Sequence, residues 1–207
     1  MEYMRGLPDK AFSLAIVDPP YGLGDRWIRP GKNTHAAAAM AGQSWDDNAP
    51  DESYFTELER VSVNQVIWGG NYFDLRPTRG VIIWDKPSMR IYTMADGEMA
   101  WTSFDRPLKI VTISNSVANR IHPTQKPVAL YKWLLQNYAK PGDTILDTHL
   151  GSGSSRIAAY DLGFDFVGIE LDKDYFEAQE QRFAEHIKQP KLFEVPKTYS
   201  QGELLAA

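Results

Sequence analysis

Residues 142–172 read GDTILDTHLGSGSSRIAAYDLGFDFVGIELD and contain the pattern of one βαβ unit. The apolar run at 144–146 predicts a short buried strand that ends at Asp147. The glycine-rich turn Gly151-Ser152-Gly153 follows and opens a helical pattern, after which a second apolar run ends at Glu170. Strand, helix and strand in this order predict a βαβ unit with two parallel strands.

The same stretch carries a candidate binding site. Glycines let the backbone approach a ligand closely, and Glu170 lies 19 positions after Gly151, where a carboxylate accepts hydrogen bonds from ribose hydroxyls. A tight strand-to-helix turn also uses glycine for purely structural reasons. Arg156 stands where a dinucleotide fingerprint requires another glycine, and the chain has no Gly-Lys-Ser/Thr loop. A ribose-bearing ligand without a pyrophosphate, such as S-adenosylmethionine, therefore fits best.

Outward from this unit, short β-branched or aromatic runs alternate with helical patterns, which predicts an α/β fold with a mostly parallel sheet. The block 98–113 lacks a helix and predicts an antiparallel hairpin at one end of the sheet. The predicted strands are 13–18, 65–69, 80–85, 98–104, 108–113, 143–147 and 165–169, and the predicted helices are 51–63, 127–139, 154–162 and 172–186.

Composition narrows the function classes. The 207 residues include no cysteine, which excludes disulfides, cysteine metal sites and a cysteine nucleophile, and we expect no metal. No signal-peptide pattern and no apolar run of about 20 residues is present, so we expect a cytoplasmic protein without membrane contact.

The net charge of −5 argues mildly against a nucleic-acid partner. Local basic clusters at 26–32 and 86–90 leave solvated loop charges and nucleic-acid contacts open, and Lys86 can either contact phosphate or pair with an acid. The first cluster contains Arg26, Arg29 and Lys32, and the second contains Lys86 and Arg90.

Two further motifs are more specific. The strand at 13–18 ends in Asp18-Pro19-Pro20-Tyr21, and His122-Pro123-Thr124-Gln125-Lys126-Pro127 precedes the glycine-rich unit. In this order, over about residues 10–185, the motifs resemble the β class of DNA amino-methyltransferases, in which the catalytic motif precedes the cofactor motifs. Trp68 to Phe73 and Ile83 to Lys86 look like the middle motifs of that family.

The resemblance implies a Rossmann-like class I methyltransferase sheet with a circularly permuted motif order. It implies one methyltransferase domain over 1–186, with a catalytic half at 10–113, a cofactor half at 122–186 and an extension at 187–207. Relatives carry another strand before the first helix, so we expect the sheet to lack one edge strand and to bind the cofactor weakly.

The family chemistry explains why a buried strand delivers an acid, two prolines and a tyrosine. An exocyclic amine is a poor nucleophile because the ring delocalises its lone pair. The Asp18 carboxylate and the Pro19 carbonyl can accept both amine hydrogens and stabilise the developing positive charge. Pro19 and Pro20 stiffen the loop, and Tyr21 offers a face for stacking a base flipped out of the duplex.

Resemblance also implies S-adenosylmethionine as the cofactor. It places Asp147, Gly151, Ser152, Gly153 and Glu170 around this ligand, with His122, Thr124 and Lys126 near its methionine end. Thr148, His149 and Leu150 depart from the usual motif, and we expect no role for His149. Trp68 and Trp84 end apolar strands and are interpreted as core residues.

The expected activity is transfer of a methyl group to adenine N6 in double-stranded DNA. Alternatives are N4-cytosine methylation, methylation of RNA or a protein glutamine, and a catalytically weak DNA-binding relative. Ser114–Ile121 is too short for a separate recognition domain. We therefore expect short-site specificity supplied by 22–50, by 86–97 or by a partner, and a homodimer.

Overall fold

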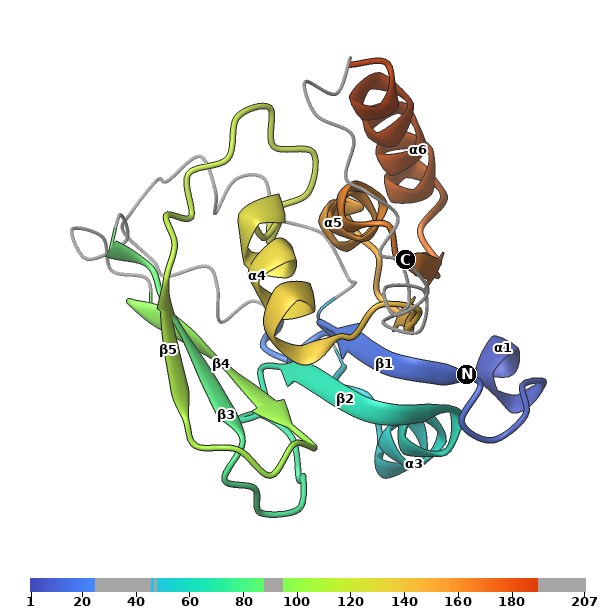
Figure 1. The fold of residues 1–207 in the computed structure, drawn as a ribbon, viewed down its shortest axis with the longest axis vertical. Coiled ribbons are helices and arrows are strands. Elements are labelled where there is room, and N and C mark those ends of the chain that lie inside the picture. The colour runs from blue at the N-terminus through green and yellow to red at the C-terminus, as the bar shows by residue number, and fades with distance from the viewer. Residues whose placement is uncertain (25–45, 47, 88–94, 190–207) are drawn as a thin grey trace, which may run out of the picture.

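The computed structural model describes residues 1–24, 46, 48–87 and 95–189. A seven-stranded sheet lies between two helical layers, with α4, α5 and α6 on one side and α3 on the other (Figure 1). The helices are α1 (Glu2–Arg5), α3 (Glu52–Val61), α4 (Val128–Tyr138), α5 (Ser154–Leu162) and α6 (Lys173–Ile187). The strands are β1 (Phe12–Val17), β2 (Ser62–Trp68), β3 (Val81–Asp85), β4 (Gly97–Thr102), β5 (Lys109–Thr112), β6 (Thr144–Asp147) and β7 (Asp165–Gly168).

The sheet has the order β5-β3-β4-β2-β1-β6-β7. Parallel pairing joins β2 to β1, β1 to β6, β6 to β7 and β3 to β5. Antiparallel pairing joins β4 to both β2 and β3. The predicted α/β class and the mostly parallel sheet are confirmed.

The predicted hairpin over 98–113 is wrong in its pairing. β4 and β5 lie on opposite sides of β3, so the antiparallel neighbour of β4 at this end is β3. The linker at 103–108 has six residues, enough to span the roughly 10 Å between strands two places apart. Ile82 and Trp84 of β3 are buried in the apolar cluster on one face of the sheet.

β7 is the outermost strand at the other edge. Among the described residues, only those of β6 pair with it. We expected the sheet to lack one edge strand, and the described part of the chain has no strand beyond β7. The basic residues at 26–32, Arg90 and the tail from 190 lie outside the described residues.

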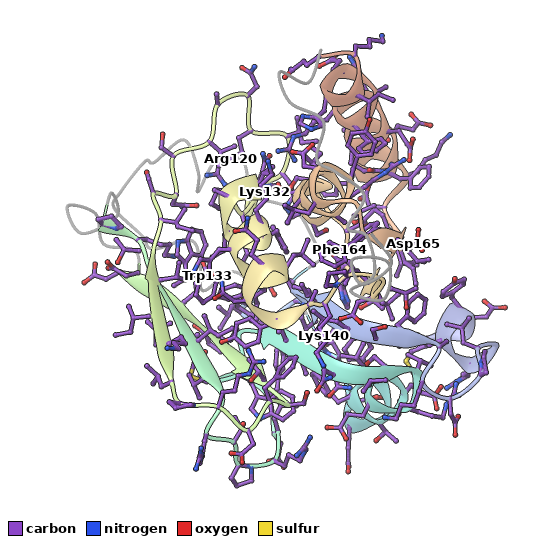
Figure 2. The ribbon with its side chains drawn as sticks, viewed as in Figure 1. Arg120, Lys132, Trp133, Lys140, Phe164 and Asp165 are labelled. Carbon is purple, nitrogen blue, oxygen red and sulfur yellow. The ribbon has the colours of Figure 1, made fainter. Side chains whose placement is uncertain are left out.

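Each face of the sheet buries its own apolar cluster. One cluster joins Ile16, Val66 and Trp84 to Leu130 and Leu134 of α4. Figure 2 shows side chains filling this layer, where Trp133 and Phe164 pack at its margin. Burial of these side chains, worth about 1.5–3 kcal/mol each, fixes the helices on the sheet.

The opposite face buries Ala15, Val17 and Ile67 against α3. α3 begins at the cap Asp51, whose carboxylate accepts the N–H of Ser53 at 3.0 Å and that of Tyr54 at 3.3 Å. Tyr54, Leu58 and Val61 are its buried residues, as the helical spacing predicts.

The strands β1, β6 and β7 are parallel neighbours, so their carboxyl ends bring three acids close together. Asp18 follows β1, Asp147 ends β6 and Glu170 comes two residues after β7. Ligands of open α/β sheets bind at the carboxyl ends of such strands. No helix in the described ranges is both long and apolar enough to cross a bilayer.

Candidate active site

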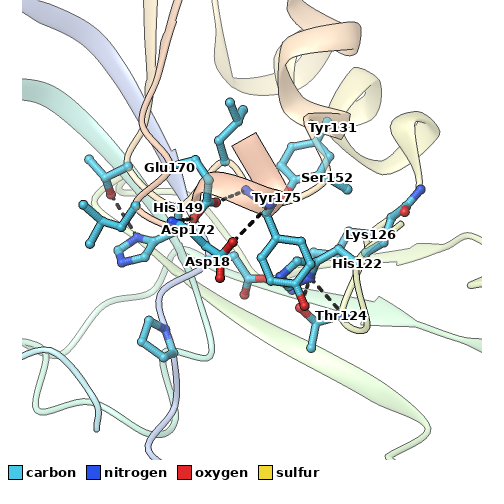
Figure 3. A pocket seen from close by; sticks show the side chains of 16 residues that line it. Asp18, His122, Thr124, Lys126, Tyr131, His149, Ser152, Glu170, Asp172 and Tyr175 are labelled. Atoms are coloured by element: carbon cyan, nitrogen blue, oxygen red, sulfur yellow. Dashed lines mark hydrogen bonds and ion pairs between the residues drawn. The ribbon is translucent and has the colours of Figure 1, made fainter. Parts of the chain in front are cut away.

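A cavity of about 310 Å³ opens at the carboxyl ends of these strands, and Figure 3 shows the side chains that line it. Its wall combines the tip of β1, the His122–Pro127 segment, the glycine-rich turn and the segment after β7. The lining residues are Asp18, Pro20, His122, Thr124, Gln125, Lys126, Tyr131, Thr148, His149, Leu150, Gly151, Ser152, Glu170, Leu171, Asp172 and Tyr175.

Most of the predicted site residues meet here. Pro19 and Tyr21 line a smaller hollow next to the cavity, and Asp18, Pro20, Thr124 and Lys126 belong to both. Asp147 and Gly153 do not line the cavity. Asp147 is buried at the end of β6, and Gly153 is the buried last residue of the glycine-rich turn.

Glu170 fixes the glycine-rich turn to the end of β7. Its Oε2 accepts the Gly151 N–H at 2.7 Å, and its Oε1 accepts the Asp172 N–H at 2.9 Å. Each carboxylate oxygen keeps a second lone pair for a further donor. The carboxylate is therefore held in one orientation on the cavity wall.

Asp147 supports the same turn from below. Its Oδ1 accepts the His149 N–H at 3.0 Å and its Oδ2 accepts the Ser155 hydroxyl at 2.6 Å. Burial raises the pKa of Asp147 to about 7, although both hydrogen bonds act in the opposite direction. Ionisation of this carboxyl in the folded protein therefore costs free energy.

Gly153 begins α5 in the left-handed region, with φ of +70°. A Cβ atom there would lie 3.1 Å from Oε1 of Gln179, the buried residue of α6. Glycine is thus required both for its backbone conformation and for the close packing of α6.

His122 is held as a neutral donor at the cavity wall. Its Nδ1 accepts the Thr124 N–H at 3.3 Å and lies 3.1 Å from the Thr124 hydroxyl oxygen. Burial, with the nearby Lys126 ammonium, lowers the pKa of His122 to about 4. An accepting Nδ1 assigns the ring proton to Nε2. The Tyr175 ring packs on it with centroids 4.3 Å apart.

The Asp18 carboxylate is oriented from both sides. The Tyr21 hydroxyl donates to Oδ1 at 2.7 Å, and the Lys126 ammonium donates to Oδ2. Burial raises the pKa of Asp18, and the Lys126 charge opposes this rise. Asp46 fixes the loop that follows, because its Oδ1 accepts the Tyr21 N–H at 2.6 Å and the Gly22 N–H at 3.1 Å.

The Tyr21 ring packs within the protein. It stacks on Tyr72 with centroids 4.8 Å apart and an interplanar angle of 13°, and it meets the edge of Phe73. Gly69 lies against the ring as well, since a Cβ there would come within 2.2 Å of Tyr21 Cε1. The base-stacking role of Tyr21 stays a prediction.

Lys126 lines the cavity and also forms a buried ion pair that the sequence did not indicate. Its side chain is only 3% exposed and its ammonium lies on Asp18 and Glu98, 3.0 Å from the Glu98 Oε2. Burial would lower the pKa of Lys126, but the two carboxylates hold it above its usual value. Lys126 therefore connects the His122–Pro127 segment with the segment that follows β1.

Sequence reasoning missed several lining residues. His149 lies in the cavity wall, with its Nδ1 3.1 Å from the Thr148 Oγ1, which in turn lies 2.6 Å from the Tyr54 hydroxyl. Tyr175 follows the helix cap Asp172, whose carboxylate accepts its N–H at 3.1 Å. The one signal for these residues was their position at strand ends and at a helix start beside the motifs.

Trp68 and Trp84 are core residues, as predicted. Both are at most 1% exposed, and their rings meet edge to face with centroids 6.1 Å apart. The Trp84 indole N–H donates to the Ile113 carbonyl at 2.8 Å.

Comparisons with known proteins agree with this geometry. A family model for N6/N4 methyltransferases, described as DNA methylase, matches residues 83–181. The chain is 28% identical over 205 residues to the putative methylase YubD of Escherichia coli K12, covering 87% of this chain and 86% of that protein. It is 23% identical over 238 residues to the type II methyltransferase M2.MboI of Moraxella bovis, covering 89% and 85%.

Solved structures show the same fold at low identity. The cytosine-N4-specific PvuII DNA methyltransferase superposes with a TM-score of 0.58 at 16% identity, covering 92% of this chain and 84% of that chain. The M1.HpyAVI–SAM complex superposes with a TM-score of 0.55 at 20% identity, covering 87% and 92%. These matches confirm the resemblance that the motifs indicated: the chain is similar to the N6/N4 DNA methylase family over residues 83–181 and to two curated methylases over most of its length.

Proposed function

We propose that this protein transfers a methyl group from S-adenosylmethionine to an exocyclic amine of a base in DNA, with adenine N6 as the preferred target. One observation carries the proposal. The Asp18 carboxylate lines the same cavity as the glycine-rich turn and Glu170, so an amine acceptor and a ribose acceptor face one space. A cavity near 300 Å³ is within the range of small-molecule sites.

The residues present fit the cofactor. Glu170 offers remaining lone pairs to ribose hydroxyls, and the neutral His122 offers its Nε2 proton to a carboxylate. Thr124 and Ser152 complete the set that would hold the ligand, with Tyr175 packed beside it. When bound, the cofactor supplies an electrophilic methyl group on a sulfonium sulfur.

Asp18 performs the electrostatic part of the chemistry. Its Oδ1 is presented by Tyr21 and can accept one amine hydrogen, while the Pro19 carbonyl can accept the other. Acceptors placed before the reaction stabilise the positive charge that develops on the nitrogen and need no reorganisation. The amine nitrogen would gain the methyl group as the methyl–sulfur bond breaks, and it would then give up one hydrogen as a proton to water. The Asp18 carboxylate stabilises the positive charge on that nitrogen until the proton has been transferred.

A tritiated-methyl transfer assay on duplex DNA, RNA and protein tests the reaction class. We expect label in DNA alone. Asp18→Ala should abolish transfer while calorimetric affinity for S-adenosylmethionine stays within about threefold of wild type. Label in RNA or protein would support the corresponding alternative, and an active Asp18→Ala variant would remove Asp18 from its assigned role.

The choice of adenine rests on the aspartate before Pro19-Pro20-Tyr21, because N4-cytosine enzymes more commonly carry serine there. Digestion of methylated DNA to nucleosides followed by mass spectrometry separates N6-methyladenine from N4-methylcytosine. We expect the adenine product, and N4-methylcytosine alone would reverse the assignment.

Two further expectations belong to the proposal. The chain acts as one methyltransferase domain over 1–186, and a second copy helps to grip DNA. Light scattering that finds a monomer both alone and with duplex DNA would contradict the dimer. Titration calorimetry that finds sub-micromolar affinity for S-adenosylmethionine would contradict the weak binding that we expect because no described strand lies beyond β7.

A further inference from the structure

A row of four alternating charges begins at Asp18 in the cavity wall. Asp18 contacts Lys126, Lys126 lies 3.0 Å from Glu98 Oε2, and the Lys86 ammonium donates to Glu98 Oε1 at 2.9 Å. The two lysine side chains are 3% and 6% exposed, and the two carboxylate side chains are 16% and 26% exposed. None of the roles assigned above involves Glu98 or Lys86.

The row joins four distant parts of the sequence. Asp18 follows β1, Lys126 precedes α4, Glu98 lies in β4 and Lys86 follows β3. The rings of Trp68 and Trp84 flank it, with the Lys126 ammonium 5.3 Å from the first centroid and the Lys86 ammonium 5.4 Å from the second. These walls keep the two ammonium groups out of water and hold them in place.

The charges balance when all four groups are ionised. Burial would raise the pKa of Glu98, but Lys126 and Lys86 together hold it below its usual value. A buried ammonium that has lost one carboxylate keeps the cost of its desolvation. Lys126 therefore depends on Glu98 as well as on Asp18 for its position.

We propose that Glu98 is a positioning residue for methyl transfer, because it holds the Lys126 ammonium on Oδ2 of Asp18 and so presents Oδ1 to the target amine. The inference rests on the proposed function. Lys86 has the narrower task of balancing the Glu98 charge. Tyr21 holds Oδ1 from the opposite side, so the carboxylate plane is fixed by one contact on each oxygen.

Glu98→Gln alone would leave the buried Lys86 ammonium without a counter-charge. A loss of activity in that variant could then come from a folding defect and not from the position of Asp18. The test is therefore the charge-balanced pair Glu98→Gln with Lys86→Met, compared with Glu98→Gln alone. An apolar version, Glu98→Leu with Lys86→Leu, guards against a folding defect, since well-packed apolar replacements of buried ion pairs are often tolerated. The control removes the α4–α5 pair of 2.7 Å with Lys132→Met and Asp161→Asn.

Thermal unfolding, calorimetric binding of S-adenosylmethionine and steady-state transfer to duplex DNA are measured for each protein. We expect the balanced pair to unfold near the wild-type temperature and to keep cofactor affinity and the KM for DNA within about twofold. Its kcat should fall at least tenfold, whereas the control pair keeps kcat. A balanced pair with wild-type stability and wild-type kcat would overturn the inference, and wild-type protein without any transfer would instead overturn the proposed function.

Discussion

The raised pKa of the Asp147 carboxyl predicts how the free energy of unfolding depends on pH. This side chain is buried beneath the glycine-rich turn, and burial raises its pKa from 3.8 to about 7. Between these values the folded chain binds more protons here than the unfolded chain. The stability that this group contributes is therefore fully present below pH 3.8 and is lost as the pH rises through 7.

The substitution Asp147→Asn keeps the shape and removes the titration. An asparagine oxygen can still accept the His149 N–H, and its amide can donate to the Ser155 hydroxyl oxygen, because that hydroxyl can turn. The full change in pKa corresponds to about 4 kcal/mol. Between pH 5 and pH 8 the expected part of it is about 2.5 kcal/mol.

Urea unfolding of both proteins at pH 5 and pH 8 measures this effect. The free energy of unfolding of Asp147→Asn, relative to wild type, should rise by about 2.5 kcal/mol from the lower to the higher pH. His122 and His149, whose pKa values burial lowers to about 4, act in the opposite direction but are common to both proteins. Asp165→Asn, at an exposed position starting β7, serves as control. A difference between Asp147→Asn and wild type that stays constant across this range would refute the reasoning.

Three further predictions follow from single contacts. Gly69→Ala, at φ +69° with a Cβ 2.2 Å from a ring atom, should destabilise by about 1–3 kcal/mol more than Gly142→Ala, which meets nothing within 4 Å; equal thermal shifts would contradict this. Lys126→Met breaks a buried ion pair and should lower the free energy of unfolding in urea by about 3–5 kcal/mol. Adding Asp18→Asn should recover part of this loss, because it removes the unpaired carboxylate. Full stability of Lys126→Met would contradict the pairing. Leu171→Ala changes a side chain that is 95% exposed and lines the cavity. The free energy of unfolding should therefore change by less than about 0.5 kcal/mol, while the Kd for S-adenosylmethionine should rise about fivefold. An unchanged Kd in calorimetry would place the ligand elsewhere.

Local patterns predicted the elements well. α5 begins and ends at Ser154 and Leu162 as predicted, and the strands deviate by only a few residues. The reason is that each element carries its own apolar period and its own cap or turn, such as Asp51 before α3. Strand pairing was less predictable, since no local pattern says that β3 enters between β4 and β5.

The same division holds for the site. The motifs named Asp18, Glu170 and the glycine-rich turn without any coordinates, because strand ends of a parallel sheet meet at one edge. Lys126 shows the limit. Its motif indicated the cofactor, whereas its ammonium lies between Asp18 and Glu98.

Periodicity and short spacings in the sequence were enough to predict the α/β class, the βαβ unit and which strand tips line the candidate site. Which charges meet depends on the tertiary fold. Asp18, Glu98 and Lys126 come from separate segments, and their contacts follow from how β1 and β4 lie in the sheet. An ion pair leaves no periodic trace in a chain, so its partners become visible only when the sheet brings their strands together.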